Sequence, residues 1–398
     1  MRILIIIPYF FPANVFGGPV KVAFDIGKEL VKRGHDVTVY TSDAKNQEVR
    51  INEKLNEIEG MKIYYFKNLS MFLVKRSNFF VTPELCKRLR ADLKKFDIIH
   101  VHEYTTYQNI PLHKFAKKYK IPYVLQAHGS LPKLDRKGRK RIYEILFGSV
   151  LLKGASKVIA LNHVEANQYM SMGIPPKKIE IIPNGINSFV DENISRGQFK
   201  RSRRIPSDKK IIIYIGRIHK SKGIDLLINA YFLLVKKMNC SNTLLIIAGP
   251  DDGYLAGAKS LVDSLNLGNL VLFTGYIKAE EKFAALADAD VFVTPAYSGF
   301  PITFLEACSI GIPLITTTKG DQMDWIDGSV GIVTLPTPFE IAKAMNLILS
   351  NKKISDKFST NGKMIVQSTF SVEKMVNKVE HMYEEIINHS NFQNNQTK

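Results

Sequence analysis

The chain has 398 residues, 45% of them hydrophobic and 23% charged, which is typical of a globular protein with more than one domain. No stretch approaches the roughly 18 apolar residues of a membrane span, and the apolar run at 3–7 is too short for a signal peptide, so neither a membrane-spanning nor a secreted protein is favoured. Residues 1–205 hold 36 of the 55 Lys and Arg and 18 of the 37 Asp and Glu, and therefore the whole net charge of +18. This asymmetry indicates a partner surface for anionic lipid or a polyanion, with a merely solubilising surface as the alternative.

Short β-branched apolar runs alternate with amphipathic segments through the first half of the chain. This alternation predicts a parallel sheet covered by helices on both faces. A helix is expected at 19–34, and further helices between most of the strands. The expected strands are residues 2–7, 36–42, 61–66, 97–102, 121–128, 157–161 and 179–183.

The charged segment 191–210 interrupts the alternation and, lacking apolar periodicity, predicts a linker. We expect an N-terminal domain at 1–190, with a final helix in 371–398 that packs back on it, and a C-terminal domain at 191–370. A cleft between the two is expected at the carboxyl ends of the strands. In the second domain the expected strands are 211–216, 243–249, 270–275, 291–295 and 313–317, and the expected helices are 222–237, 279–287 and 303–310.

The segment "GRIHKSKG" (216–223) follows a predicted strand and opens a helix. An Arg fork, a Lys point charge and a helix N-terminus suit a diphosphate, which makes Arg217 and Lys222 candidate ligand contacts. Two solvated surface cations are the alternative interpretation. The segment matches neither a Walker A loop nor Gly-x-Gly-x-x-Gly, so it gives no support to ATP or NAD sites.

Two segments of the first domain are further candidates. In "FGGPVKVA", Gly17 and Gly18 allow the backbone to approach a ligand. An ordinary strand-to-helix turn, with Pro19 near the first helical position, is the alternative interpretation. In "LQAHGS", His128 ends a predicted strand, where it could donate a hydrogen bond or relay a proton; a structural histidine is the alternative.

Two patterns resemble metal sites. His100 and His102 share a strand face but have no third ligand at zinc-like spacing, and the Asp-x-Asp at 288–290 is better explained by capping and strand entry. No metal and no cofactor are therefore expected. Three separated cysteines without Cys-x-x-Cys spacing indicate buried free thiols in a reducing cytosol: Cys86, Cys240 and Cys308.

Together with "IIPNGI", "AGPDDG", "LFTGYI" and "PAYSGFPITFLEACSIGIP" (295–313), these motifs resemble the GT-B glycosyltransferases of the retaining family GT4, in order along nearly the whole chain. The resemblance implies two Rossmann-like domains facing each other across a cleft. It implies that the N-terminal domain binds the acceptor and the C-terminal domain a sugar nucleotide. Arg217 and Lys222 would hold the diphosphate, Glu306 the ribose hydroxyls, Gly17 and Gly18 the diphosphate from the other domain, and His128 would lie near the sugar. The further implied donor contacts are Gly275, Tyr276, Ile277, Gly299, Phe300, Pro301, Ile302 and Thr303.

The resemblance also implies front-face displacement with retention, usually without metal, in which the leaving diphosphate helps to deprotonate the acceptor hydroxyl. Many members carry Glu-x7-Glu, but Ser298 stands at the first position here. Either the Gly-Phe-Pro backbone replaces that acid or the donor sugar is held differently, and an inactive protein is a third reading. Ser298 is accordingly not assigned a catalytic role.

Six of the nine residues 133–141 are Lys or Arg, and an apolar run follows within 133–157. A basic edge beside apolar residues suits an anionic bilayer, so we expect a cytoplasmic protein, peripheral at the inner face of the plasma membrane. The expected partners are a UDP- or GDP-sugar donor and a lipid-linked or glycan acceptor. Nucleic acid is not expected because no binding motif is present. A GT-B sugar-nucleotide epimerase and a non-catalytic sugar-nucleotide binder are the alternatives.

Overall fold

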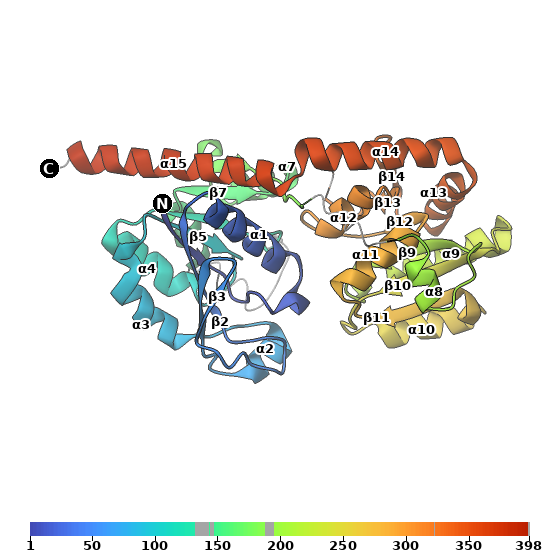
Figure 1. The fold of residues 1–398 in the computed structure, drawn as a ribbon, viewed down its shortest axis with the longest axis horizontal. Helices are drawn as coiled ribbons and strands as arrows, with labels where there is room; N and C mark the ends of the chain where they lie inside the picture. Colours follow the sequence, from blue (N-terminus) through green and yellow to red (C-terminus); the bar gives the residue numbers. More distant parts are fainter. Residues whose placement is uncertain (132–142, 144–146, 188–194, 322, 397–398) are drawn as a thin grey trace. The chain divides into compact units, whose positions relative to one another are not determined.

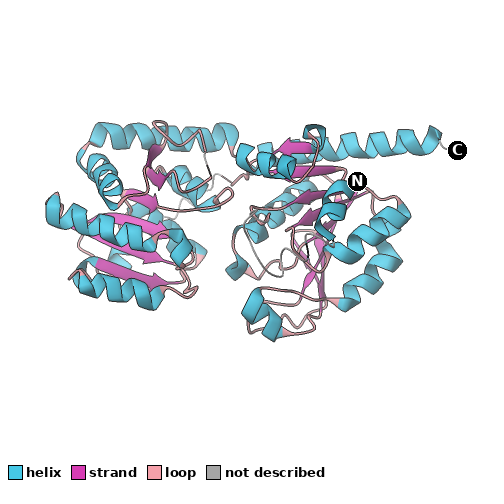
Figure 2. Cartoon of the chain, turned by 180° about the vertical axis from the view of Figure 1, so that it is seen from behind, coloured by secondary structure: helices cyan, strands magenta, loops and turns pink. Residues whose placement is uncertain are grey.

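The computed structural model describes residues 1–131, 143, 147–187, 195–321 and 323–396 (Figure 1). The chain divides into two compact units, Met1–Gly185 with Val372–Lys398, and Ile186–Ser371. Each unit has a central sheet with helices on both faces, as Figure 2 shows. The predicted α/β class is confirmed.

The first unit contains an eight-stranded sheet in the order β3-β4-β2-β1-β5-β6-β7-β8. Every neighbouring pair is parallel except β3 and β4. The sequence missed β3 because its side chains are mostly exposed and show no apolar alternation. The strands are β1 (Arg2–Ile6), β2 (Asp36–Ser42), β3 (Leu55–Ile58), β4 (Met61–Phe66), β5 (Ile98–His102), β6 (Tyr123–Gln126), β7 (Lys157–Ala160) and β8 (Ile179–Ile181).

The C-terminal helix of the chain belongs to this unit by its contacts. The Glu380 carboxylate lies 2.6 Å from both Arg33 Nη1 and His35 Nε2, which follow α1. Tyr383, from the same helix, is fully buried. The helices are α1 (Gly18–Lys32), α2 (Met71–Ser77), α3 (Pro83–Asp92), α4 (Asn109–Tyr119), α6 (Ser149–Gly154), α7 (His163–Ser171) and α15 (Val372–Gln396).

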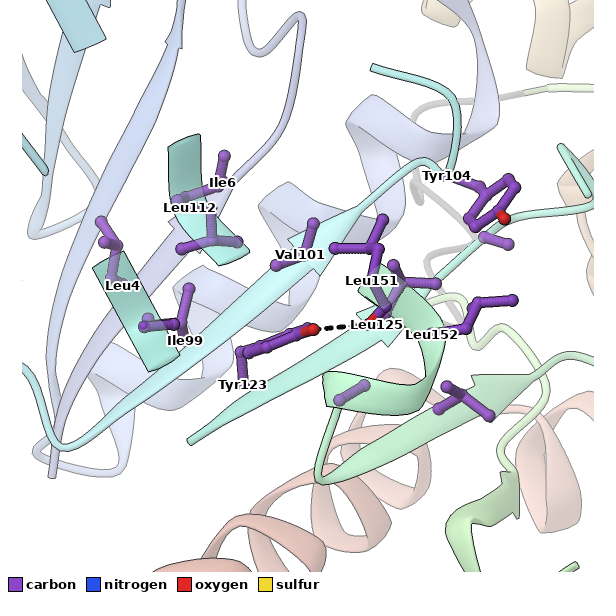
Figure 3. Close-up of a cluster of buried hydrophobic side chains, with 14 of the residues drawn as sticks. Leu4, Ile6, Ile99, Val101, Tyr104, Leu112, Tyr123, Leu125, Leu151 and Leu152 are labelled. Carbon is purple, nitrogen blue, oxygen red and sulfur yellow. Dashed lines mark hydrogen bonds between the residues drawn. The ribbon is translucent and has the colours of Figure 1, made fainter. Parts of the chain in front are cut away.

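The core of this unit lies between the sheet and the helices that cover it (Figure 3). Leu4, Ile99 and Leu125 come from three neighbouring strands and are fully buried. Each such side chain contributes about 1.5–3 kcal/mol through burial. The Tyr123 hydroxyl donates to the Leu151 carbonyl at 2.5 Å and so ties α6 to β6. The carboxyl ends of β5 and β6, next to His102 and His128, therefore lie over a well-packed core.

The second unit contains a six-stranded, fully parallel sheet in the order β11-β10-β9-β12-β13-β14. The short β14 was not expected from the sequence. The strands are β9 (Lys210–Ile215), β10 (Thr243–Ala248), β11 (Val271–Gly275), β12 (Val291–Thr294), β13 (Leu314–Thr317) and β14 (Gly331–Thr334). The helices are α8 (Gln198–Ser202), α9 (Ile224–Lys237), α10 (Leu255–Ser264), α11 (Ala279–Asp288), α12 (Ile302–Ile310), α13 (Pro338–Ser350) and α14 (Lys352–Thr369).

The linker predicted at 191–210 is wrong for its described part, because α8 and the start of β9 lie inside it. Phe199 of α8 is 1% exposed and gives the segment a core contact. Asp288 accepts hydrogen bonds from the backbone N–H groups of Gly197 and Lys200 and so caps the start of α8. Asp290 accepts from Ile211 N at 2.8 Å. The structural interpretation of the Asp-x-Asp pattern is therefore confirmed.

Most of the basic segment 133–157 lies outside the described residues. In its described part, Leu151 and Leu152 are buried in the core, while Val150 is exposed. Of the three cysteines, only Cys308 is fully buried; Cys86 and Cys240 are half-buried free thiols, so the prediction of three buried thiols is partly wrong. Among the described helices, none combines the length and the apolar character needed to cross a membrane.

Candidate functional site

In the second unit, the carboxyl ends of β9, β10 and β11 are joined by backbone hydrogen bonds. Gly216 N donates to Ala248 O at 2.9 Å, and Gly249 N donates to Gly275 O at 2.8 Å. A Cβ atom at Gly249 would lie 1.9 Å from the Gly216 carbonyl oxygen, and this residue has a φ of +143°. Only glycine fits there, so the three strand ends form a close-packed backbone platform from which Arg217 extends.

Arg217 lies directly after this platform, with an exposed side chain. Its Nη1 atom contacts Asp252 Oδ2 at 2.7 Å, and Asp252 follows β10. An exposed ion pair of this kind contributes at most about 1 kcal/mol. The guanidinium can therefore exchange Asp252 for a phosphate at small cost. The sequence did not identify Asp252, because its proximity depends on β9 and β10 being neighbours.

Lys222 ends a short turn before α9, and its side chain is half-buried. The next residue, Gly223, has a φ of +70°. A Cβ atom at Gly223 would lie 3.0 Å from Cβ of Pro295, the first residue after β12. The turn that carries Lys222 therefore lies against the start of the Gly-Phe-Pro loop, as a shared ligand site requires.

The Gly-Phe-Pro loop leads from β12 into α12. Ser298 is exposed, whereas Gly299 is buried with a φ of +70°. The backbone N–H of Gly299 donates to Asp321 Oδ2 at 2.6 Å. Asp321 thus brings a carboxylate beside Ser298, the position at which the resemblance predicts an acid. The residues around Ser298 in the sequence did not predict this neighbouring carboxylate, because Asp321 comes from the segment after β13.

Glu306 on α12 is 2% exposed. Its Oε1 atom accepts a hydrogen bond from Lys282 Nζ at 2.6 Å, and Lys282 comes from the neighbouring helix α11. Its Oε2 atom is buried and has no hydrogen-bond partner among the described residues. A buried acceptor on a charged group without a partner is unfavourable, and a ligand hydroxyl would relieve this. Lys282 was not identified from the sequence because its pairing depends on the packing of α11 against α12.

The other candidate donor contacts differ in what they can offer. Tyr276 is 53% exposed and Thr303 is half-buried, so their side chains can reach a ligand. Three apolar side chains are buried, and only their backbones are available: Ile277, Phe300 and Ile302. Gly275 has a φ of +69° with open space beside it, and Pro301 is the N-cap of α12.

In the first unit, Gly17 is the N-cap of α1, and Gly18 is its first residue. Gly17 has a φ of +95°, with nothing within 4 Å of a Cβ atom built there. Its backbone conformation, and not crowding, therefore requires glycine. On the same carboxyl edge, Tyr9 Oη donates to Glu103 Oε1 at 2.8 Å, which connects the loops after β1 and β5.

His128 follows β6 in a left-handed conformation, with a φ of +55°. The buried Glu165 carboxylate holds the adjacent backbone by accepting hydrogen bonds from Gly129 N and Leu161 N, both at 2.7 Å. His128 Nε2 lies 2.8 Å from His102 Nδ1. Burial lowers the pKa of His128 to about 3, so the imidazole is neutral near pH 7.

His100 and His102, the pair considered as metal ligands, stack with ring centroids 4.1 Å apart. Tyr383 Oη lies 2.6 Å from His100 Nδ1. Burial lowers the pKa of His100 to about 3 and that of His102 well below its usual value. These rings therefore form a neutral stack that connects α15 to His128.

Two units, each with a largely parallel sheet covered by helices, are the arrangement that the resemblance to GT-B glycosyltransferases predicts. Family models bear this out: glycosyl transferases group 1 matches residues 195–364, and glycosyltransferase family 4 matches residues 16–188. The chain belongs to this family of group 1, GT4-like glycosyltransferases, and it is a transferase. The resemblance stated from the sequence is confirmed.

Individual relatives agree with this assignment. An uncharacterized glycosyltransferase of Methanocaldococcus jannaschii is 27% identical and covers 94% of this chain and 95% of its own length. An O-antigen biosynthesis glycosyltransferase of Escherichia coli is 25% identical and covers 92% and 94%. The crystal structure of Anabaena HepE in complex with UDP and glucose superimposes with a TM-score of 0.78 at 17% identity, over 97% of this chain and 100% of that one. The last comparison confirms the GT-B fold.

Proposed function

We propose that this glycosyltransferase moves a hexose-type sugar from a UDP- or GDP-sugar to a hydroxyl acceptor. The observation that carries the proposal is the half-satisfied carboxylate of Glu306, which Lys282 holds at one oxygen only. An ionised carboxylate accepts two hydroxyl hydrogen bonds well, and the ribose of a nucleotide offers two adjacent hydroxyls. Anabaena HepE, whose fold is similar, binds UDP, which supports the choice of donor class.

Arg217 and Lys222 are proposed to bind the diphosphate. Both lie at the carboxyl edge of the parallel sheet, on turns that precede or adjoin helix starts. Arg217 would give up its exposed contact with Asp252 for a bidentate phosphate contact, which is stronger. Gly17 and Gly18 are proposed to approach the same diphosphate from the first unit.

The reaction is proposed to retain the anomeric configuration. The bond from the anomeric carbon to the diphosphate oxygen breaks, and the acceptor oxygen bonds to that carbon on the same face. The acceptor proton passes to the departing diphosphate, which carries the electron pair of the broken bond. Arg217 and Lys222 stabilise the charge that develops there, so the step needs neither a protein nucleophile nor a metal.

The acceptor is proposed to be lipid-linked or a glycan, as in polysaccharide or glycoconjugate synthesis. The O-antigen enzyme of Escherichia coli is a relative over most of its length, which supports this class. The positive charge of residues 1–205 supports a peripheral position on an anionic membrane. Flotation with anionic vesicles tests the membrane part, and an absence of binding at low salt would remove it.

Calorimetric titration with UDP, GDP and ADP, followed by 2′-deoxy-UDP or 2′-deoxy-GDP, tests the donor site. We expect UDP or GDP to bind, and the 2′-deoxy form to bind at least tenfold more weakly if Glu306 holds that hydroxyl. Equal affinity for both forms would contradict the role of Glu306. NMR analysis of the products then separates transfer to an acceptor from epimerisation of the donor, and binding without turnover would indicate a non-catalytic protein.

A further inference from the structure

Three imidazoles, those of the buried His100 and His102 and the half-buried His128, lie close together at the carboxyl edge of the first sheet. His100 and His102 alternate with Val101 on β5 and so share one face. His128 follows β6, which pairs with β5 in parallel. The rings of His102 and His128 are nearly parallel, with centroids 5.1 Å apart and 13° between their planes.

The hydrogen bond between His102 Nδ1 and His128 Nε2 requires one proton, and either ring could supply it. His102 Nε2 is buried and has no partner among the described residues. The His128 side chain is only half-buried, and its Nδ1 atom is not among the buried polar atoms that have no partner. The two nitrogens outside the hydrogen bond therefore differ, because only that of His102 is a buried atom without a partner.

This difference decides which ring donates. If His128 donated, the single proton of neutral His102 would sit on Nε2, as a buried N–H group without an acceptor. A buried N–H group that loses water without gaining an acceptor is costly, and native structures leave a buried N–H group without an acceptor less often than they leave a buried acceptor without a donor. The proton of His102 therefore belongs on Nδ1, where it forms the hydrogen bond. His128 Nε2 is then the acceptor, and the one proton of His128 is on Nδ1.

We propose that His102 is a positioning residue that holds His128 in the Nδ1–H tautomer, so that His128 offers the substrate a hydrogen-bond donor and no base. The part of this inference that concerns the substrate rests on the proposed function. The group that accepts the hydrogen bond from His128 Nδ1–H would be an oxygen atom with a lone pair, such as a sugar hydroxyl or a phosphate oxygen. His128 would therefore orient the substrate through its Nδ1–H group and would neither accept nor release a proton during the reaction.

Tautomers of histidine can be read directly from the ¹⁵N shifts and the long-range ¹H–¹⁵N couplings of the ring. In the ligand-free protein we expect both His102 and His128 to show a protonated Nδ1 and a bare Nε2. A His128 ring protonated at Nε2 would overturn the inference. Because no nucleotide is added, this result is independent of the proposed function: a protein that binds no sugar nucleotide could still show these tautomers.

Two variants form a matched pair. In His102→Asn the amide nitrogen can occupy the place of Nδ1 and keep the donor, whereas in His102→Gln the amide lies at the place of Nε2 and the donor to His128 is lost. We expect His102→Asn to keep the His128 tautomer and His102→Gln to release it, with kcat/KM about tenfold lower for the Gln variant than for the Asn variant. Thermal melts of both identify a loss of fold. Identical tautomers and rates in two folded variants would refute the role of His102.

Discussion

Removal of Lys282 should test the electrostatic arrangement at Glu306. Lys282→Met keeps the apolar stem of the side chain and deletes its ammonium group. Glu306, 2% exposed, would then have neither oxygen paired by a described side chain. Breaking a buried ion pair by removing one partner costs about 3–5 kcal/mol. Because the Lys282 side chain is 20% exposed, we expect the lower end of that range, about 3 kcal/mol.

For a unit of this size, such a loss lowers the melting temperature by about 6–12 °C. Scanning calorimetry of wild type, Lys282→Met, Glu306→Gln and the double variant gives a full double-mutant cycle. Glu306→Gln removes the charge that needs Lys282, so the Lys282→Met change should cost only about 1 kcal/mol on that background. A single Lys282→Met variant that melts within about 1 °C of wild type would refute the reasoning.

Three other expectations can be tested with simple variants or conditions. Tyr383→Phe leaves His100 Nδ1 without its partner and should lower the free energy of unfolding, measured by urea denaturation, by about 1–2 kcal/mol. An unchanged free energy of unfolding would mean that this hydrogen bond does not stabilise the protein. Because the pKa of His100 is about 3 in the folded state and about 6.5 in the unfolded state, the unfolded state binds more protons below pH 6.5. Protonation of His100 in the unfolded state therefore leaves the free energy of unfolding unchanged above pH 6.5 and lowers it as the pH falls toward 3, by about 2 kcal/mol at pH 5. In urea titrations at several pH values, a His100→Gln variant should lack this part of the pH dependence. Lys222→Ala should weaken nucleotide binding at least tenfold in calorimetry. Ser298→Ala, which changes an exposed side chain in the same site, is the control and should bind like wild type. Loss of binding in Ser298→Ala alone would contradict both the role of Lys222 as a diphosphate contact and the absence of a role for Ser298.

Local sequence patterns were sufficient for most of the fold. Strands such as β1 and β10 are short apolar runs buried on both faces, and such runs are typical of the strands of a covered parallel sheet. Exposed β3 and the short helix α8 lack such a pattern. The start of α8 is capped by Asp288 from α11, so the signal for the helix lies about ninety residues away in the sequence.

The candidate site was predictable only where one segment carries the whole motif. Arg217, Lys222 and Glu306 come from such segments. Their partners Asp252 and Lys282 come from neighbouring elements, and only the strand order and helix packing bring them within reach. The same holds for His102, which the sequence presented as half of a metal pair and which the structure joins to His128.

The place of α15 in the first unit also governs the order in which the protein can be assembled on the ribosome. Residues up to Gly185 are made before the second unit, and Val372–Gln396 are made after it. At about 5–20 residues per second, the nascent first unit waits roughly 10–40 s for its final helix. During that interval Arg33 and His100 lack Glu380 and Tyr383, while the continuous chain of the second unit can already fold. Of the two units, the one whose synthesis begins earlier is therefore completed later, because its final helix follows the whole of the second unit in the chain.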